Sequence, residues 1–202
     1  MTSVQNLCGN VPVIAILRGI TEAEITDICD VLFRAGVHAL EIPLNTPNAI
    51  RIIATAVNHC SSRQIVGAGT VLTPDEVNAV ADAGGKFIIS PNTDVSVISE
   101  TVKRGLISIP GFLTPSEAFT AIAAGADFLK LFPAGNFGID YVKNLQAVIK
   151  TPILAVGGIG PDNGKDFLSV CAGLGIGSAI FKPGDTQETV EKKAAALLAA
   201  IR

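Results

Sequence analysis

Two ionisable side chains lie within apolar runs where charged residues are uncommon. Lys130 stands in FLKLF (residues 128–132), between Leu129 and Leu131. Burial disfavours the charged form of a lysine and lowers its pKa, and a neutral amine can add to a ketone and form a Schiff base. A lysine at the end of a strand can also extend its ammonium to solvent or pair with an acid. The segment alone is compatible with both roles.

The second such residue is Glu41, in HALEIPLNTP (residues 38–47). Its carboxylate can act as a general acid or base that moves protons for lysine chemistry, directly or through a water molecule. Alternatively, an ion pair with Lys130 or Arg18 would only compensate a buried charge. One interior lysine and one interior glutamate on different strands of the same fold favour the catalytic interpretation of both.

Short apolar runs alternate with longer helical patterns along the chain. We expect strands over residues 11–17, 39–43, 65–68, 87–90, 106–110, 128–132, 153–156 and 173–176. We expect helices near residues 22–35, 47–59, 74–83, 94–104, 115–124, 139–149, 162–169 and 187–200, and a short helical segment before the first strand. TPDE (73–76) and TPSE (114–117) each place Thr at the N-cap, Pro at the first helical position and Glu at the third.

The predicted strands are nearly continuous apolar runs, which is typical of parallel strands covered on both faces. Eight strand–helix units predict a (β/α)₈ TIM barrel, formed by residues 1–202 as a single domain. A flavodoxin-like or Rossmann sheet is the alternative. It would normally have fewer strands, and no GxGxxG motif follows the first predicted strand.

Glycine-rich turns follow the last two predicted strands, at VGGIG (156–160) and GIGS (175–178). In a TIM barrel the chemistry lies at the carboxyl ends of the strands, and these two turns usually bind phosphate. Glycine lets backbone N–H groups approach phosphate oxygens closely, and a hydroxyl such as that of Ser178 can add a donor. Such turns can also be tight connections without a ligand, but two on adjacent strands favour a phosphate site.

Other strand ends carry polar or rigid residues that could complete a pocket. Arg18 ends the first strand and Thr70 the third, so they could hold a carboxylate or hydroxyl of the substrate. Pro91, in SPN after the fourth strand, could shape the pocket wall. Each also has a purely structural explanation, as an exposed cation, a hydroxyl at a helix start or a tight turn.

The composition excludes several other classes of function. The chain has 202 residues, is 49% hydrophobic and 16% charged, and carries a net charge of −3 without a basic block. Nucleic acid and anionic membranes are therefore not expected partners. No apolar run reaches about 18 residues, and MTSVQNLCGN does not resemble a signal peptide, so we expect a cytoplasmic protein.

The four cysteines and two histidines form no CxxC or HExxH motif, which predicts free thiols, no metal, no cofactor and no histidine-dependent hydrolase.

Seven motifs together resemble the 2-keto-3-deoxy-6-phosphogluconate / 2-dehydro-3-deoxy-6-phosphogalactonate aldolase family. They are VPVIAILRG, EIPLNTP, VGAGTVL, ISPN, IPGFLTPSEA, LKLFPA and AVGGI, in the family's order. The resemblance implies a metal-independent class I aldolase, usually a homotrimer, that cleaves a phosphorylated keto acid to pyruvate and glyceraldehyde 3-phosphate. It also implies that Lys130 forms the Schiff base and Glu41 transfers protons, that Arg18 and Thr70 lie near the carboxylate and keto end, and that Gly157, Gly158, Gly177 and Ser178 bind phosphate.

Two departures point to the phosphogalactonate branch of this family. Asn45 stands where phosphogluconate-type enzymes commonly have an arginine that would hold the carboxylate, so we expect Arg18 to carry more of that role. Val156 stands where they commonly have a threonine whose hydroxyl would meet the sugar chain. The two substrates are epimers at C4, and one polar contact is worth about 1–1.5 kcal/mol. A phosphogluconate aldolase with the same mechanism is the alternative.

Two interpretations without a Schiff base also stay open. A phosphate-binding barrel of another chemistry, such as a sugar-phosphate isomerase or a thiamine-phosphate synthase, would use the glycine turns but give Lys130 no covalent role. A non-catalytic binder of phosphorylated sugar acids would need neither Lys130 nor Glu41 for chemistry.

Overall fold

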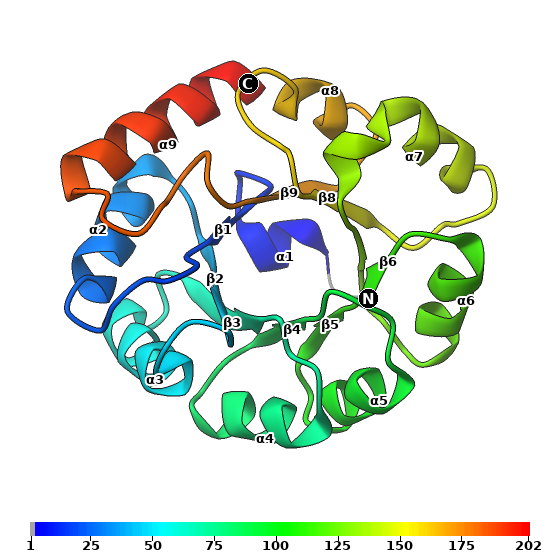
Figure 1. The fold of residues 1–202 in the computed structure, drawn as a ribbon, viewed down its shortest axis with the longest axis horizontal. Helices are drawn as coiled ribbons and strands as arrows, with labels where there is room; N and C mark the ends of the chain where they lie inside the picture. Colours follow the sequence, from blue (N-terminus) through cyan, green and yellow to red (C-terminus); the bar gives the residue numbers. More distant parts are fainter. Residues whose placement is uncertain (1–2) are drawn as a thin grey trace.

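Parallel strands surrounded by helices form a barrel in the computed structural model, which describes residues 3–202 (Figure 1). The strands are β1 (Val13–Ile16), β2 (Ala39–Pro43), β3 (Ile65–Gly69), β4 (Phe87–Ile89), β5 (Ile107–Ile109), β6 (Gly111–Phe112), β7 (Leu129–Leu131), β8 (Ile153–Val156) and β9 (Gly173–Ile176). The α-helices are α1 (Val4–Cys8), α2 (Ile25–Ala35), α3 (Ala49–Cys60), α4 (Pro74–Asp82), α5 (Val95–Lys103), α6 (Pro115–Ala123), α7 (Gly138–Gln146), α8 (Gly164–Leu168) and α9 (Gln187–Ile201).

The strands pair in the order β5-β4-β3-β2-β1-β9-β8-β7-β6, so β5 and β6 stand at the two ends of the sheet. Only Pro110 separates β5 from β6, and proline lacks the N–H that a continuous ladder would use. The Pro110 carbonyl still accepts a hydrogen bond of 2.8 Å from the backbone N–H of Lys130 on β7. We therefore treat β5 and β6 as two parts of one strand that closes an eight-stranded barrel, which confirms the predicted fold.

The predicted elements are all present, with changes at their ends. The fifth strand extends past Pro110 to Phe112, whereas the prediction ended it at the proline. Helix α2 begins at Ile25 and α8 covers only Gly164–Leu168, so both are shorter than expected. Both predicted capping boxes form, at Thr73 with Glu76 and at Thr114 with Glu117.

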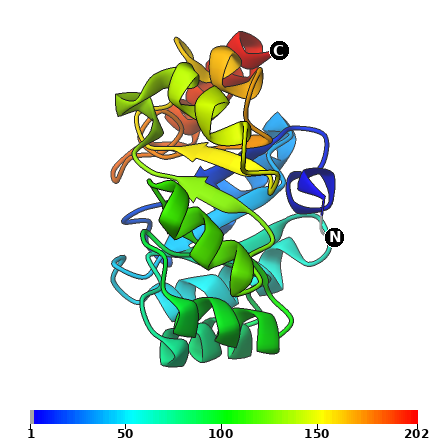
Figure 2. The same cartoon turned by 90° about the vertical axis from the view of Figure 1, so that its right-hand side faces the viewer.

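Side chains inside the barrel form their own apolar cluster, apart from the larger one between the strands and the helices. The inner cluster includes Ile14, Phe87 and Leu154 from three different strands, and Phe128, the residue before β7. Its other members include Leu7 and Cys8 of α1, which are fully buried. Helix α1 lies across one end of the barrel, at the right in Figure 2. The end where the strands begin is thereby closed, and a cavity can open only at the other end.

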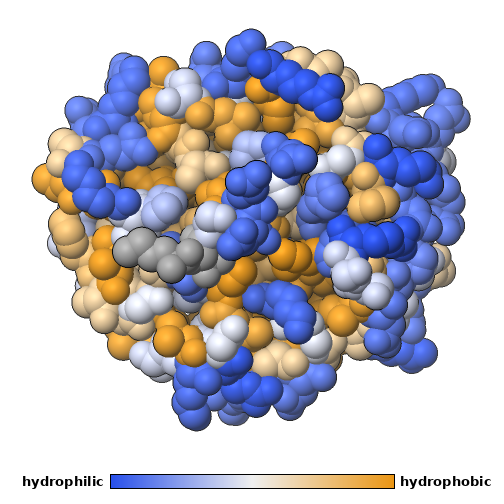
Figure 3. Space-filling view, turned by 180° about the vertical axis from the view of Figure 1, so that it is seen from behind, coloured by the Kyte–Doolittle hydropathy of each residue, from blue (hydrophilic) through white to orange (hydrophobic). Residues whose placement is uncertain are grey.

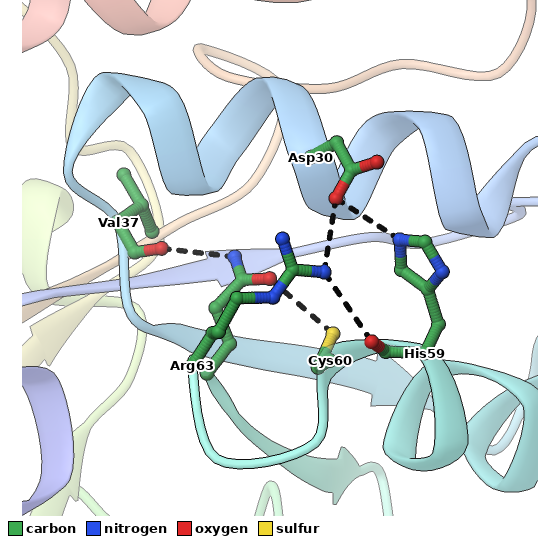
Figure 4. A network of polar contacts seen from close by, with 6 residues as sticks. Asp30, Val37, His59, Cys60 and Arg63 are labelled. Carbon is green, nitrogen blue, oxygen red and sulfur yellow. Dashed lines mark hydrogen bonds and ion pairs between the residues drawn. The ribbon is translucent and has the colours of Figure 1, made fainter.

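A polar network connects α2 to the end of α3 on the outside of the barrel (Figure 4). The Asp30 carboxylate accepts a hydrogen bond from Arg63 at 3.2 Å and contacts Nε2 of His59 at 3.0 Å. Arg63 also donates to the backbone carbonyl of His59 at 3.3 Å. These contacts lie away from the barrel interior, so they concern stability and not the site.

The end of the molecule that carries α1 presents a mixture of hydrophilic and hydrophobic residues, with the hydrophilic ones most concentrated at the right of the view (Figure 3). In residues 3–202 no helix combines the length and the hydrophobicity needed to cross a bilayer. The four cysteines are buried and none of them forms a disulfide.

Candidate active site

A cavity of about 600 Å³ opens at the carboxyl ends of the strands. Every predicted site residue except Asn45 lines it: Arg18, Glu41, Thr70, Pro91, Lys130, Val156, Gly157, Gly158, Gly177 and Ser178. These residues come from seven strands or the loops after them. Asn45 follows β2 but is exposed and lies outside this lining, so its predicted role in substrate binding gains no support from its position.

Lys130 is the middle residue of β7, and its side chain is only 6% exposed. Its register is set on both sides, because it pairs with Gly111 of β6 and with Leu154 of β8. Burial lowers the pKa of the ammonium below 10.5; the charge of Glu41 opposes this shift and that of Arg18 adds to it. Its Nζ also lies 5.0 Å from the centroid of the Phe132 ring. The result is an amine that faces the cavity and is more readily deprotonated than an exposed lysine.

Glu41 is the third residue of β2, and it is 2% exposed. Burial raises the pKa of its carboxyl group, and the positive charges of Lys130 and Arg18 act in the opposite direction. None of the ion pairs within residues 3–202 includes Glu41 or Lys130. The two residues thus share a cavity without a direct ion pair, and the ion-pair explanation of either one is not supported.

The glycine turns after β8 and β9 present backbone N–H groups at the cavity wall. Gly157 and Gly158 have φ angles of 89° and 72°, in the left-handed region that glycine adopts without steric cost. In the described part of the chain, the hydrogen bonds do not use the N–H groups of Gly158 or Ser178. Asn163 stabilises the first turn, because it accepts from the Gly160 N–H and donates to the Gly158 carbonyl, both at 2.9 Å. Such free N–H groups beside a cavity are suited to an anion.

The remaining predicted residues lie at other points of the cavity wall. Arg18 lines the cavity just after β1, and β1 pairs with β9, the strand that leads to the second glycine turn. Thr70 follows β3 with a φ of 56°, which is unusual for a β-branched residue. Backbone strain of this kind occurs often at ligand sites. Val156 is 5% exposed and contributes an apolar surface to the wall.

Sequence reasoning missed several residues of the lining, including Phe132, Asp162, Asn163 and Lys182. Phe132 belongs to the quoted run around Lys130, but its contact with the ammonium depends on the local backbone. Lys182 is exposed and lies four residues after Ser178 in the loop that leads to α9. Lys182 lies outside the strand ends, and the signal in the sequence that could have identified it is a cation close to a predicted phosphate turn.

The chain matches the family model described as "KDPG and KHG aldolase" over residues 4–196. It is 42% identical over 194 residues to the 2-dehydro-3-deoxy-6-phosphogalactonate aldolase of Escherichia coli (strain K12), covering 95% of both chains. It is 41% identical to a protein of Rhizobium meliloti (strain 1021) named as a probable aldolase of the same type, with 94% of this chain and 91% of the relative covered. A solved structure described as "Native KDPGal structure" superimposes with a TM-score of 0.92 at 41% identity and covers 95% of this chain and 94% of its own.

Proposed function

The chain belongs to the KDPG and KHG aldolase family, and we propose that it cleaves 2-dehydro-3-deoxy-6-phosphogalactonate through a Schiff base on Lys130. Aldolases of this family are lyases, and the products of this cleavage are pyruvate and D-glyceraldehyde 3-phosphate. The observation that carries the proposal is the buried amine of Lys130 in the same cavity as the buried carboxyl group of Glu41.

The reaction begins when the neutral amine of Lys130 adds to the C2 carbonyl carbon of the substrate and forms a carbinolamine. Glu41 supplies the proton with which the C2 oxygen leaves as water, and an iminium ion remains. Removal of the C4 hydroxyl proton by Glu41, or by a water that it holds, then breaks the C3–C4 bond. The electrons of this bond form an enamine, and the aldehyde leaves. Protonation at C3 and hydrolysis of the imine release pyruvate and restore the amine.

The shifted pKa values of both residues suit this sequence of steps. A lowered pKa increases the fraction of Lys130 that is neutral and able to attack the ketone. A raised pKa keeps the Glu41 carboxyl group protonated closer to neutral pH, so that it can donate as well as accept a proton. No step in this scheme requires a metal or an organic cofactor.

The phosphate is assigned to the glycine turns after β8 and β9. Gly157, Gly158, Gly177 and Ser178 would supply backbone and hydroxyl donors, and Lys182 in the following loop would add a positive charge. Arg18 is assigned to the substrate carboxylate and Thr70 to the keto end, with Pro91 as part of the wall. Because Asn45 is exposed and lies outside the cavity lining, the carboxylate contact rests on Arg18.

Borohydride reduction in the presence of pyruvate tests the covalent step. We expect a pyruvate-derived adduct on the peptide that contains Lys130, and loss of activity in Lys130→Ala by roughly 10³-fold or more. A matched control is Lys192→Ala, which removes an exposed lysine of α9. An unmodified Lys130, or full activity of Lys130→Ala, would exclude the mechanism and favour a barrel enzyme or binder without a Schiff base.

The substrate epimer is tested by measuring kcat/KM for 2-dehydro-3-deoxy-6-phosphogalactonate and 2-keto-3-deoxy-6-phosphogluconate side by side. We expect the galactonate epimer to be preferred, and Val156→Thr to move the ratio toward the gluconate epimer by about tenfold, the value of one added hydrogen bond. A ratio that does not change would rule out Val156 as the determinant. The opposite preference in the wild type would favour the phosphogluconate aldolase.

We also propose the homotrimer that is usual in this family. Light scattering with size-exclusion chromatography should give three times the 20.8 kDa chain mass. A monomeric or dimeric mass would exclude this assembly without affecting the proposed chemistry.

A further inference from the structure

The inner face of β3 carries very few side-chain atoms. Side chains of a strand alternate between its two faces. Val66 and Ala68 belong to the outer apolar cluster, whereas Ile65 packs against the cluster inside the barrel. The two inward positions that follow Ile65 are therefore Gly67 and Gly69, which have no side chain.

Large side chains from the neighbouring strands occupy the space that these two glycines leave. A β-carbon at Gly67 would lie 2.4 Å from the ring of Phe87, which comes from β4. A β-carbon at Gly69 would lie 1.7 Å from Oε1 of Glu41 and 2.4 Å from its carboxyl carbon. Carbon atoms do not approach other atoms so closely, so any side chain at residue 69 must displace the carboxyl group.

Backbone conformation does not explain the glycine at residue 69. Gly69 is absent from the glycines with positive φ, and it pairs regularly with Pro43 of β2. Its carbonyl accepts a hydrogen bond of 2.8 Å from the N–H of Leu44. Alanine could adopt this backbone, and what excludes it is the volume that the Glu41 carboxyl group already fills.

The register of β2 and β3 explains how the carboxyl group reaches this place. Glu41 pairs with Gly67, yet its carboxyl group lies against Gly69, two residues closer to the open end of the barrel. The side chain therefore extends along the inner face of β3 toward the cavity. The ring of Phe87 fills the space at Gly67, so the Glu41 side chain cannot extend toward the closed end of the barrel instead.

We propose that Gly69 is a positioning residue for the proton-transfer group Glu41, because its missing side chain is the space in which the carboxyl group lies. Gly69 itself touches neither substrate nor reacting atoms in this proposal. The inference rests on the proposed function, since it is the acid–base role of Glu41 that makes the position of its carboxyl group matter.

A double-mutant cycle of G69A and E41A tests this relationship, because it measures whether the two sites act through each other. We expect G69A to lower kcat by at least about tenfold and to leave KM nearly unchanged. The loss should not exceed the roughly 10²–10⁴-fold that complete loss of acid–base catalysis costs. We expect G69A to lose the limb of the pH–kcat profile that E41A also loses. In the E41A background, where the carboxyl group is gone, adding G69A should change kcat less than twofold.

Thermal unfolding of the same four proteins provides a second readout. G69A should lower the Tm of the wild type but not that of E41A, since alanine has room once the carboxyl group is removed. Gly67→Ala serves as a matched control: it should lower the Tm through its contact with Phe87 and keep the wild-type pH–kcat profile.

Two outcomes separate this inference from the proposed function. Wild-type kcat in G69A, or equal loss of kcat from G69A in both backgrounds, would overturn the positioning role of Gly69 while E41A stays impaired. Full activity of E41A would instead overturn the acid–base role of Glu41, and with it the catalytic meaning of the contact.

Discussion

Lys130 and Glu41 reach the same cavity from β7 and β2. Burial lowers the pKa of Lys130 and raises that of Glu41, which favours the neutral form of both, and the charge of each residue opposes the shift of the other. The two strands are separated by β1, β9 and β8 in the order of the sheet, so the residues stand on different parts of the barrel wall. A close ion pair would keep both groups charged and unreactive. The observed arrangement instead permits proton exchange through a substrate or water between them.

The pH dependence of Schiff-base formation should respond to both charged neighbours of Lys130. The amine reacts when neutral, so the rate rises with pH through its pKa, which is below 10.5. Glu41 raises this pKa, so Glu41→Gln should move the rise to lower pH. Arg18 lowers it, so Arg18→Ala should move the rise to higher pH. The rate of borohydride trapping with pyruvate, measured from pH 5 to 10, checks both directions, and shifts of the opposite sign would contradict the assigned electrostatics.

Lys182 should contribute to binding of the phosphate but not to the chemistry. In the direction of aldol addition, Lys182→Ala should raise the KM for glyceraldehyde 3-phosphate by about tenfold, because a hydrogen bond to a charged group is lost. The KM for glyceraldehyde, which has no phosphate, should stay the same. An equal effect on both aldehydes would show that Lys182 acts on the fold of the loop and not on the phosphate.

The Asp30 network predicts a pH-dependent contribution to stability. The hydrogen bond from His59 lowers the pKa of the Asp30 carboxyl group below its ordinary value of 3.8, and Arg63 adds to this effect. A lowered acid pKa stabilises the fold above pH 3.8, and the stabilisation is lost as the pH falls through the folded-state pKa. Because Asp30 is partly exposed, Asp30→Asn should cost at most about 1 kcal/mol near neutral pH.

Urea unfolding at pH 7 and at pH 3 measures this contribution. The difference between wild type and Asp30→Asn should be largest at pH 7 and should shrink at the lower pH. Asp140→Asn is a suitable control, since its ion pair with Lys143 is far more exposed. A difference that grows in acid would show that the network does not stabilise the charged carboxylate.

The thiols should be unreactive in the folded protein. Cys8, Cys29, Cys60 and Cys171 are all buried, and burial raises the pKa of Cys8 and of Cys171 to about 12. Since the thiolate is the reactive form, titration with a disulfide reagent at pH 8 should be slow in the native state. Four thiols should react once the chain is unfolded in denaturant. Rapid reaction of any thiol in the native protein would contradict this prediction.

Much of the architecture could be predicted from the sequence because its signals are local. The apolar strands and the TPDE and TPSE helix starts act over a few residues, and each is confirmed where the chain order puts it. Lys130 and Glu41 could be selected because a charge within an apolar run is costly unless it is compensated or used. The motifs that surround them also identified the family.

The positions that could not be settled from the sequence depend on contacts between distant residues. Asn45 lies two residues after the end of β2, yet only the path of the loop decides that it is exposed. Pro110 interrupts the hydrogen-bond ladder between strands, yet the barrel closes across it because the backbone N–H of Lys130 donates a hydrogen bond to the Pro110 carbonyl. Gly69 lies at a predicted strand end, but the sequence does not show whether a glycine there is needed for a turn or to leave room for another side chain. Only the tertiary structure shows that room is needed, because the register of β2 and β3 places the Glu41 carboxyl group against the backbone of Gly69.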